Sequence, residues 1–309
     1  VKRPLVGIIG AGQVGATAGA RLARNNAADV ALYDVVEGMP QGKALDLAQA
    51  GPVDGYGVTI SGGNDLSVIA GSRVVIVTAG VARKPGMSRD DLLKINAGVI
   101  KTASLGIAKH APDSIVIMVT NPLDAMAYLA LKTTGFAKNR VVGMAGVLDS
   151  ARFRTFLSME TGGPPEKIEA VVLGGHGDSM VPLLKHTKID GRPVRDVLSP
   201  GALERIVNRT RNGGAEIVGL LKTGSAYYAP GASAAFMAEK ILSDANDVLP
   251  CSVCLDGEYG LKDVFAGVPA RLGAEGVKEV IEYDLDAGEF AALRASASAV
   301  SETIKALGL

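Results

Sequence analysis

The chain of 309 residues carries 32 Lys and Arg residues against 32 Asp and Glu residues, so its formal net charge is zero. This balance excludes a general electrostatic attraction to nucleic acid or to an anionic membrane surface. Hydrophobic residues make up 48% and aromatic residues only 4%, while 39 glycines indicate many tight turns, a composition that suits a parallel α/β fold.

The length and the cysteine content indicate the number of domains and the cellular compartment. At roughly 150 residues per domain, the chain is expected to form two domains. Two cysteines, Cys251 and Cys254, are too few for a disulfide framework and fit a reducing compartment, so we expect a cytoplasmic location. No segment approaches the roughly 20 apolar residues of a membrane span.

Short apolar runs alternate with longer helical patterns through the first half of the chain. They lie at Leu5 to Ile9, Val30 to Tyr33, Val74 to Val77 and Ile115 to Val119. Continuous runs without polar alternation are typical of strands covered on both faces, and the strand-helix-strand order predicts right-handed parallel crossovers. The sequence therefore predicts an α/β fold with a Rossmann-type doubly wound parallel sheet.

The pattern changes at about residue 145, where longer helices are mixed with strand-like pieces. We expect helices at 149–161 and 202–222 and strands at 168–173 and 276–281. The predicted division is a Rossmann domain over residues 1–145 and a mixed α+β domain over 146–309. Alternating steps of three and four predict a final helix packed through one apolar stripe of Phe290, Leu293, Ala297, Val300, Ile304 and Leu307.

A glycine-rich turn follows the first predicted strand and opens an Ala-rich helical stretch. Gly10 permits the tight turn, Gly12 lets the backbone approach a pyrophosphate, and Gly15 lets helix and strand pack closely. Asp34 ends the second strand, where a carboxylate can accept hydrogen bonds from an adenosine ribose. Two alternatives stay open. The glycine pattern can match by chance in a chain with this many glycines, and Asp34 can be an ordinary turn residue at the end of a strand. Because a carboxylate repels a 2′-phosphate, the predicted cofactor is NAD rather than NADP.

Three histidines are candidates for proton transfer. His110 ends a helical run and His186 lies among surface lysines, so both are interpreted as ordinary. His176 lies among glycines after an apolar strand, where a substrate can approach its imidazole. Asp149 and Arg152 stand three apart on a predicted helix and so share one face. Asp149 would orient the imidazole and Arg152 would clamp a carboxylate, although a surface ion pair is the commoner reading of such spacing.

At this point the residues resemble the lactate/malate dehydrogenase family, and within it the malate dehydrogenases of lactate-dehydrogenase-like type. The resemblance covers nearly the whole chain. Besides the glycine turn and Asp34, it is carried by ARKPGMSR at 82–89, TNPLD at 120–124, LDSAR at 148–152, GGHGD at 174–178 and LDGEYG at 255–260.

The resemblance implies a role for each residue of a candidate site. His176 exchanges the hydroxyl proton of the substrate, Asp149 orients it, and Arg152 binds the carboxylate beside the reacting carbon. Arg89 polarises the carbonyl, and Arg83 binds the second carboxylate of a dicarboxylic substrate. Asn121 hydrogen-bonds near the reacting centre, Ser225 lines the pocket, and the Asn121–Pro122 bond is expected to be cis. The expected cofactor-binding set is Gly10, Gly12, Gln13, Val14, Gly15, Asp34, Asn96, Val119 and Asn121.

These implications predict NAD-dependent exchange between (S)-malate and oxaloacetate, as in the tricarboxylic acid cycle. Arg83 favours a dicarboxylate, because a closed pocket would otherwise leave a buried arginine unpaired. A lactate or other 2-hydroxy acid dehydrogenase and a non-catalytic NAD-binding protein are the alternatives. The family implies a homodimer or homotetramer. Cys251 and Cys254 are interpreted as small buried hydrophobes, and no metal constellation is predicted.

Overall fold

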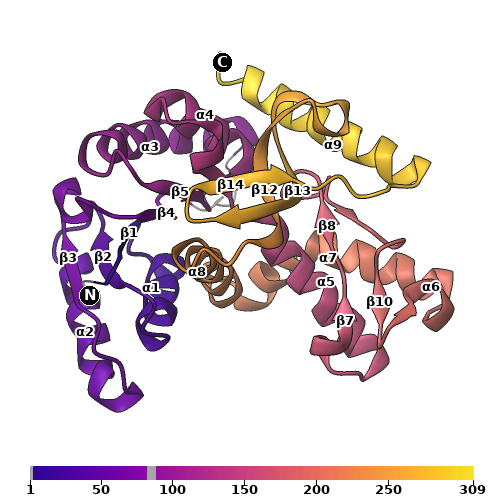
Figure 1. Ribbon diagram of the computed structural model, residues 1–309, viewed down its shortest axis with the longest axis horizontal. Coiled ribbons are helices and arrows are strands. Elements are labelled where there is room, and N and C mark those ends of the chain that lie inside the picture. Colours follow the sequence, from indigo (N-terminus) through magenta and orange to yellow (C-terminus); the bar gives the residue numbers. More distant parts are fainter. Residues whose placement is uncertain (1–2, 82–87) are drawn as a thin grey trace.

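The computed structural model describes residues 3–81 and 88–309. A nine-stranded sheet runs through the middle of this part of the molecule, as Figure 1 shows. In spatial order, its strands are β14 (Gly276–Val280), β13 (Lys262–Gly273), β12 (Asp247–Asp256), β6 (Val141–Gly143), β5 (Ile115–Met118), β4 (Val74–Val77), β1 (Leu5–Ile9), β2 (Asp29–Tyr33) and β3 (Ile60–Gly63).

Strands β1 to β6 are parallel, and the strand order reverses between β1 and β4. In the register, Ile8 lies between Leu32 on one side and Ile76 on the other. The central strands are buried along nearly their whole length, as the continuous apolar runs predict. The predicted doubly wound parallel sheet is therefore confirmed.

Helices cover both faces of the parallel strands, as Figure 1 shows. On one face, α1 (Gln13–Arg24), α2 (Met39–Asp54) and α8 (Tyr228–Leu242) pack on the strand side chains that include Ile8 and Ile76. On the other face, α3 (Arg89–His110), α4 (Leu123–Thr134) and α9 (Ala287–Lys305) pack on those that include Ile9 and Val77. Two apolar cores result, one on each side of the sheet.

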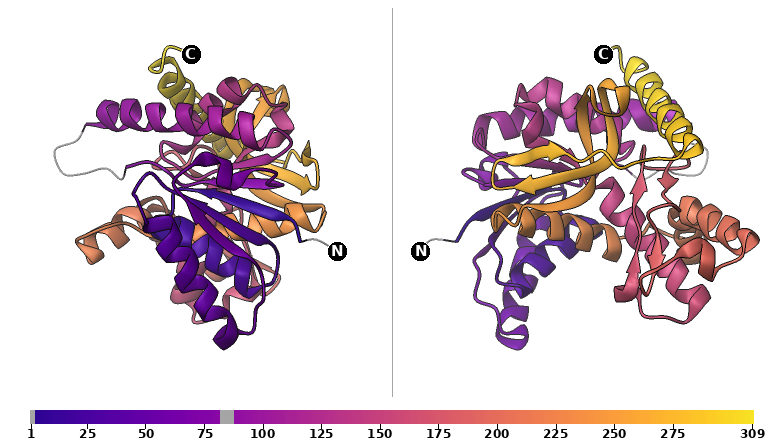
Figure 2. Two further views of the ribbon diagram at one scale, coloured as in Figure 1. Left: turned by 90° about the vertical axis from the view of Figure 1, so that its left-hand side faces the viewer. Right: turned by 45° about the vertical axis from the view of Figure 1, so that its right-hand side comes forward.

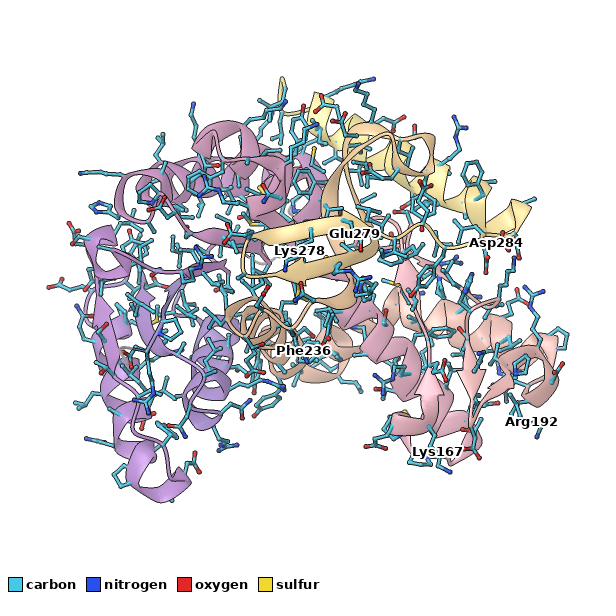
Figure 3. All side chains as sticks on the ribbon, viewed as in Figure 1. Lys167, Arg192, Phe236, Lys278, Glu279 and Asp284 are labelled. Carbon is cyan, nitrogen blue, oxygen red and sulfur yellow. The ribbon has the colours of Figure 1, made fainter. Side chains whose placement is uncertain are left out.

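The second half of the chain extends the same sheet with three antiparallel strands. β12 pairs with β6 through Ser252 and Gly143, and β13 and β14 follow. The sequence predicts β14 and a strand-like stretch after Pro250 that forms part of β12. It does not predict β13 or the full length of β12, because polar residues interrupt both apolar patterns. Lys278 and Glu279 are labelled on the edge strand β14 in Figure 3, and charges of this kind discourage pairing with a further strand.

The remaining elements form a smaller body with its own apolar core around Phe153 and Leu157. The expected strand at 168–173 is wrong as one unit, because residues 168–169 and 172–173 pair in two different sheets. The elements are α5 (Ala145–Thr161), β7 (Ile168–Glu169), β8 (Val172–Leu173), β9 (Val181–Pro182), β10 (Lys188–Ile189), β11 (Arg192–Pro193), α6 (Val194–Val197) and α7 (Pro200–Leu221). Short 3-10 helices lie at Leu66–Ile69, Lys138–Arg140, Pro165–Lys167 and Glu258–Gly260.

The final helix, α9, packs through most of the predicted stripe, whose four central residues from Leu293 to Ile304 are buried. The prediction is wrong at Phe290, which is 37% exposed, and Leu307 lies beyond the end of the helix. The buried residue of the first turn is Glu289 instead, because its carboxylate closes a capping box with Asp286. α9 contacts α4, β9 and β13.

Candidate functional site

The glycine turn joins β1 to α1 at the carboxyl edge of the sheet. Gly10 has φ +102°, and a Cβ there would lie 2.5 Å from the Ala79 nitrogen. A Cβ on Gly15 would lie 2.0 Å from the Gly10 carbonyl oxygen. At Gly12, by contrast, no atom lies within 4 Å of a Cβ position. The backbone is thus tightly packed at Gly10 and Gly15 and open at Gly12, which is where a pyrophosphate needs access to the start of α1.

Asp34 directly follows β2, and its carboxylate lies beside the glycine turn. Oδ2 accepts a hydrogen bond from the Ala11 nitrogen at 2.8 Å, and Oδ1 accepts one from the Val36 nitrogen at 3.1 Å. Gln13 and Val14 begin α1 next to this turn. The arrangement offers an acidic group, an open backbone and a helix N-terminus together, and these features fit the adenosine and pyrophosphate parts of NAD.

The ends of β4 and β5 meet through the side chain of Asn96. Its Oδ1 accepts from the Val81 nitrogen at 2.9 Å, and its Nδ2 donates to the Asn121 carbonyl oxygen at 2.7 Å. Asn96 is 1% exposed, so its cofactor contact stays a prediction beside a clear internal role. Val119 is half-buried and Asn121 is exposed at this edge. The Asn121–Pro122 bond is cis, which confirms the expectation for it.

The structure brings His176, Asp149 and Arg152 together. His176 Nδ1 lies 2.8 Å from Asp149 Oδ2, and Arg152 Nη1 donates to Asp149 Oδ1 at 3.2 Å. The Asp149 side chain is 3% exposed, against 12% for His176 and 14% for Arg152. One buried carboxylate therefore holds an imidazole and a guanidinium that both retain some access to solvent.

The charges around His176 favour its protonated form. Burial is the largest single influence and lowers the pKa of His176, and Arg152 also lowers it. The charge and hydrogen bond of Asp149, with a contribution from the charge of Asp124, outweigh these effects, so the pKa is raised above its ordinary value. A histidine in this environment can hold a proton near neutral pH and release it to a substrate.

Arg152 keeps hydrogen-bonding capacity that is not used within the described part of the chain. Its Nε is buried and has no acceptor there. Helix α7 passes close by, and a Cβ on Gly213 would lie 3.3 Å from Arg152 Cδ. The glycine thus lets α7 pack closely against the stem of the arginine side chain. A guanidinium with an unpaired N–H is suited to a charge-assisted hydrogen bond with a carboxylate.

Asp124 is a site residue to which sequence reasoning assigned no role. Its Oδ2 accepts a hydrogen bond from the His176 nitrogen at 2.8 Å, and its Oδ1 accepts one from Ser252 Oγ at 2.6 Å. Burial raises the pKa of this carboxyl, while the two hydrogen bonds oppose that rise. The available signal was its position in TNPLD, the motif that directly follows the fourth predicted strand. Asp124 ties the His176 loop to the carboxyl end of β5.

Three other predicted site residues, Arg83, Arg89 and Ser225, have no contact in the described part of the chain that tests their roles. Arg83 falls outside the described residues, and Arg89 begins α3, which Ser88 and Asp91 cap, although its side chain lies outside them. Ser225 is exposed in the segment between α7 and α8. The roles implied for these three residues stay predictions.

The remaining candidates have structural surroundings. His110 ends α3, and His186 pairs through Nε2 with the Asp284 carbonyl oxygen at 2.8 Å. Cys251 is fully buried, and burial raises the pKa of its thiol to about 12, so it behaves as a small hydrophobe as predicted. Cys254 is half-buried and its pKa is raised by burial as well.

Of the helices in the described ranges, none has the length and apolar character needed to cross a bilayer.

Comparisons with known proteins match almost the whole chain. The family profile for the lactate/malate dehydrogenase NAD binding domain matches residues 5–143, and that for the lactate/malate dehydrogenase alpha/beta C-terminal domain matches 146–307. The chain is 55% identical over 305 residues to malate dehydrogenase of Roseiflexus sp. (strain RS-1), covering 99% of both. It is 51% identical over 309 residues to that of Desulforudis audaxviator (strain MP104C), covering 100% of both.

Solved structures show the same architecture. Malate dehydrogenase from Cryptosporidium parvum superposes with a TM-score of 0.97 at 42% identity, with 99% of each chain covered. Lactate dehydrogenase from Cryptosporidium parvum, complexed with lactic acid and nicotinamide adenine dinucleotide, superposes with a TM-score of 0.96 at 39% identity, covering 100% of this chain and 99% of that one. Since both proteins share this fold, the fold alone does not select between their substrates.

Proposed function

The chain belongs to the lactate/malate dehydrogenase family, and on that premise we propose that it catalyses the reversible NAD-dependent oxidation of (S)-malate to oxaloacetate. Relatives at 51–55% identity over nearly the full length are named malate dehydrogenase, which supports this choice of substrate. The observation that carries the proposal is the 2.8 Å pair between His176 and the buried Asp149, with Arg152 on the same carboxylate.

The residues present fit NAD. The open backbone at Gly12 and the start of α1, with Gln13 and Val14, would hold the pyrophosphate, and Asp34 would accept from the adenosine ribose. Val119, Asn121 and Asn96 would border the nicotinamide end. When bound, the nicotinamide supplies a hydride acceptor or donor, and the chain supplies binding, orientation and proton transfer.

His176 would move the proton. Because Nδ1 faces the Asp149 carboxylate, Nε2 is the ring atom left to face a substrate. In oxaloacetate reduction, protonated His176 donates from Nε2 to the carbonyl oxygen, and the Asp149 carboxylate stabilises the imidazolium before that step. In malate oxidation, neutral His176 accepts the hydroxyl proton at the same atom.

Arginines would bind and orient the substrate. Arg152 would hold the carboxylate beside the reacting carbon through the guanidinium N–H groups that its bond with Asp149 leaves available. Arg89 would polarise the carbonyl and Arg83 would pair with the distal carboxylate, while Asn121 and Ser225 would border the same space. With a substrate that lacks the distal carboxylate, the Arg83 guanidinium would have no partner once the pocket closed, and breaking a buried pair costs about 3–5 kcal/mol.

Paired assays test the proposal directly. Initial rates of NADH and NADPH oxidation are measured with oxaloacetate and with pyruvate, for the native chain and for Arg83→Gln. We expect NADH with oxaloacetate to be the preferred pair, and the variant to lose far more efficiency with oxaloacetate than with pyruvate. Preference of the native chain for pyruvate would support a lactate dehydrogenase instead, and equal losses in the variant would remove Arg83 as the selector.

The wider setting follows from the same proposal. We infer a boundary between an NAD-binding domain (1–145) and a substrate domain (146–309), supported by family matches that end at residue 143 and begin at 146. We further infer a cytoplasmic homodimer or homotetramer that acts in the tricarboxylic acid cycle. Light scattering of the purified chain measures its mass, and a monomer at micromolar concentration would contradict the assembly.

A further inference from the structure

The C-terminal helix α9 contacts the loop that carries His176. The Gly175 nitrogen donates to Ser296 Oγ at 2.7 Å, and Ser296 Oγ donates to Ser179 Oγ at 2.9 Å. Ser296 is 1% exposed, so its hydroxyl is shielded from bulk water. Figure 1 and the right view of Figure 2 show α9 passing above the end of β8, from which the loop emerges.

Two successive backbone amides of the loop are held by side chains from two different elements. The Gly175 amide is held by Ser296 of α9, and the His176 amide by Asp124 of α4. Since these amides belong to the peptide units on either side of the Gly175 Cα, the two anchors fix the backbone from which the His176 side chain projects. Asp149, on α5, then meets the imidazole from a third element.

The packing of α9 on the loop leaves little freedom. Gly174 has φ +84°, and a Cβ there would lie 2.8 Å from Ser296 Oγ. A Cβ on Gly175 would lie 3.0 Å from Val300 Cγ2, one helical turn further along α9. A side chain at either glycine would press on α9, so the loop and the helix are closely packed.

We propose that Ser296 is a positioning residue for the reaction: its hydroxyl, delivered by α9, holds the Gly175 amide and so sets the place of His176 against Asp149. The inference rests on the proposed function, because it needs His176 to be the proton-transfer residue. It also assigns to α9 a part in the site, whereas the sequence pattern indicates only a packing helix.

Loss of the hydroxyl acts on proton transfer for a geometric reason. Without it the Gly175 amide is buried and unpaired, and the loop relaxes toward another acceptor. Asp149, Arg152 and Asp124 are the charged groups that face His176, and they come from α5 and α4. The Nδ1–Oδ2 pair therefore lengthens, and the imidazole no longer presents Nε2 in the aligned position.

The experiment compares Ser296→Ala and Ser296→Cys with a matched control on the same helix, Ser301→Ala. The hydroxyl of Ser301 donates only to the Ala297 carbonyl of its own helix, at 3.1 Å. Ser296→Cys keeps the size of the side chain but offers a weak sulfur acceptor. For each variant, kcat and KM for oxaloacetate, KM for NADH, the pH profile of kcat/KM and the Tm are measured, with His176→Asn in parallel.

We expect Ser296→Ala to lower kcat for oxaloacetate roughly tenfold or more, with KM for NADH within about twofold of native. Because Asp149 supports the protonated imidazole, the alkaline limb of the pH profile moves to lower pH. Ser296→Cys lies between Ala and native, and Ser301→Ala matches native. The proposal is overturned if Ser296→Ala has the native kcat and the alkaline limb of its pH profile stays in the native position, whatever its Tm. If Ser296→Ala does not fold, the same criteria apply to Ser296→Cys. Normal turnover in His176→Asn would refute the proposed function itself, which separates the two failures.

Discussion

The substitution Asp149→Asn removes the negative charge that binds both His176 and Arg152, while the side chain keeps nearly the same size and shape. In the native chain each carboxylate oxygen accepts from a different partner, Oδ2 from His176 at 2.8 Å and Oδ1 from Arg152 at 3.2 Å. Asparagine offers a single oxygen. If that oxygen stays with His176, the amide N–H faces the guanidinium, donor against donor; if it turns to Arg152, the amide N–H faces Nδ1 and disfavours the imidazolium.

The size of the effect follows from the burial of this residue. Asp149 is 2% exposed, so water does not replace the lost acceptor. A hydrogen bond to a charged group contributes about 1.5–3 kcal/mol. At about 1.4 kcal/mol for each factor of ten, the loss of one such bond lowers kcat/KM for oxaloacetate by roughly 10- to 150-fold.

The pH profile separates this cause from a general loss of structure. Burial lowers the pKa of His176 and Asp149 raises it, so the pKa falls when the carboxylate is removed. Reduction needs the protonated imidazole; activity is therefore present below this pKa and lost as pH rises through it, and the alkaline limb moves to lower pH in the variant. A matched control is Asp190→Asn, which breaks an exposed pair with Lys167 at the lower right of Figure 3 and leaves the profile unchanged. A limb in its native position in Asp149→Asn would refute the reasoning.

Two further predictions concern the dinucleotide side. Asp34→Ser combined with Val35→Arg exchanges an anion for a cation beside the turn and is expected to shift preference from NADH toward NADPH; an unchanged ratio of efficiencies contradicts the role of Asp34. Gly15→Ala places a Cβ 2.0 Å from the Gly10 oxygen and is expected to lower the Tm and weaken NADH binding. The control is Gly42→Ala in α2, where no atom lies within 4 Å of an added Cβ. This variant is expected to stabilise the fold by about 0.5–1 kcal/mol. Equal effects in the two variants count against close packing at Gly15.

The parallel strands and the glycine turn were predictable because their signals are local. β1 matches the apolar run from Leu5 to Ile9 end for end, since a strand buried on both faces has no polar residue to interrupt the pattern. α5 begins at Ala145, four residues before the predicted start, and no capping side chain marks that end. Local patterns therefore predict the type of an element better than its ends.

The site likewise contains some contacts that local spacing predicts and others that it does not. Asp149 and Arg152 share a helix face, so spacing alone predicts that they are neighbours. The anchors of the His176 loop are not accessible to such reasoning, because Asp124 and Ser296 lie 52 and 121 residues from the amides they hold. Their contacts depend on how α4 and α9 pack, which no local pattern encodes. The same holds for β12 and β13, whose place in the large sheet is set by pairing with β6.

Proton transfer at His176 is the central claim, and His176→Asn tests it most directly. NADH oxidation is followed at saturating oxaloacetate, and NADH binding is measured by fluorescence on the same preparation. The account predicts that turnover falls by roughly 10²- to 10⁴-fold while the Kd for NADH stays near native. Turnover close to native with intact NADH binding would contradict it.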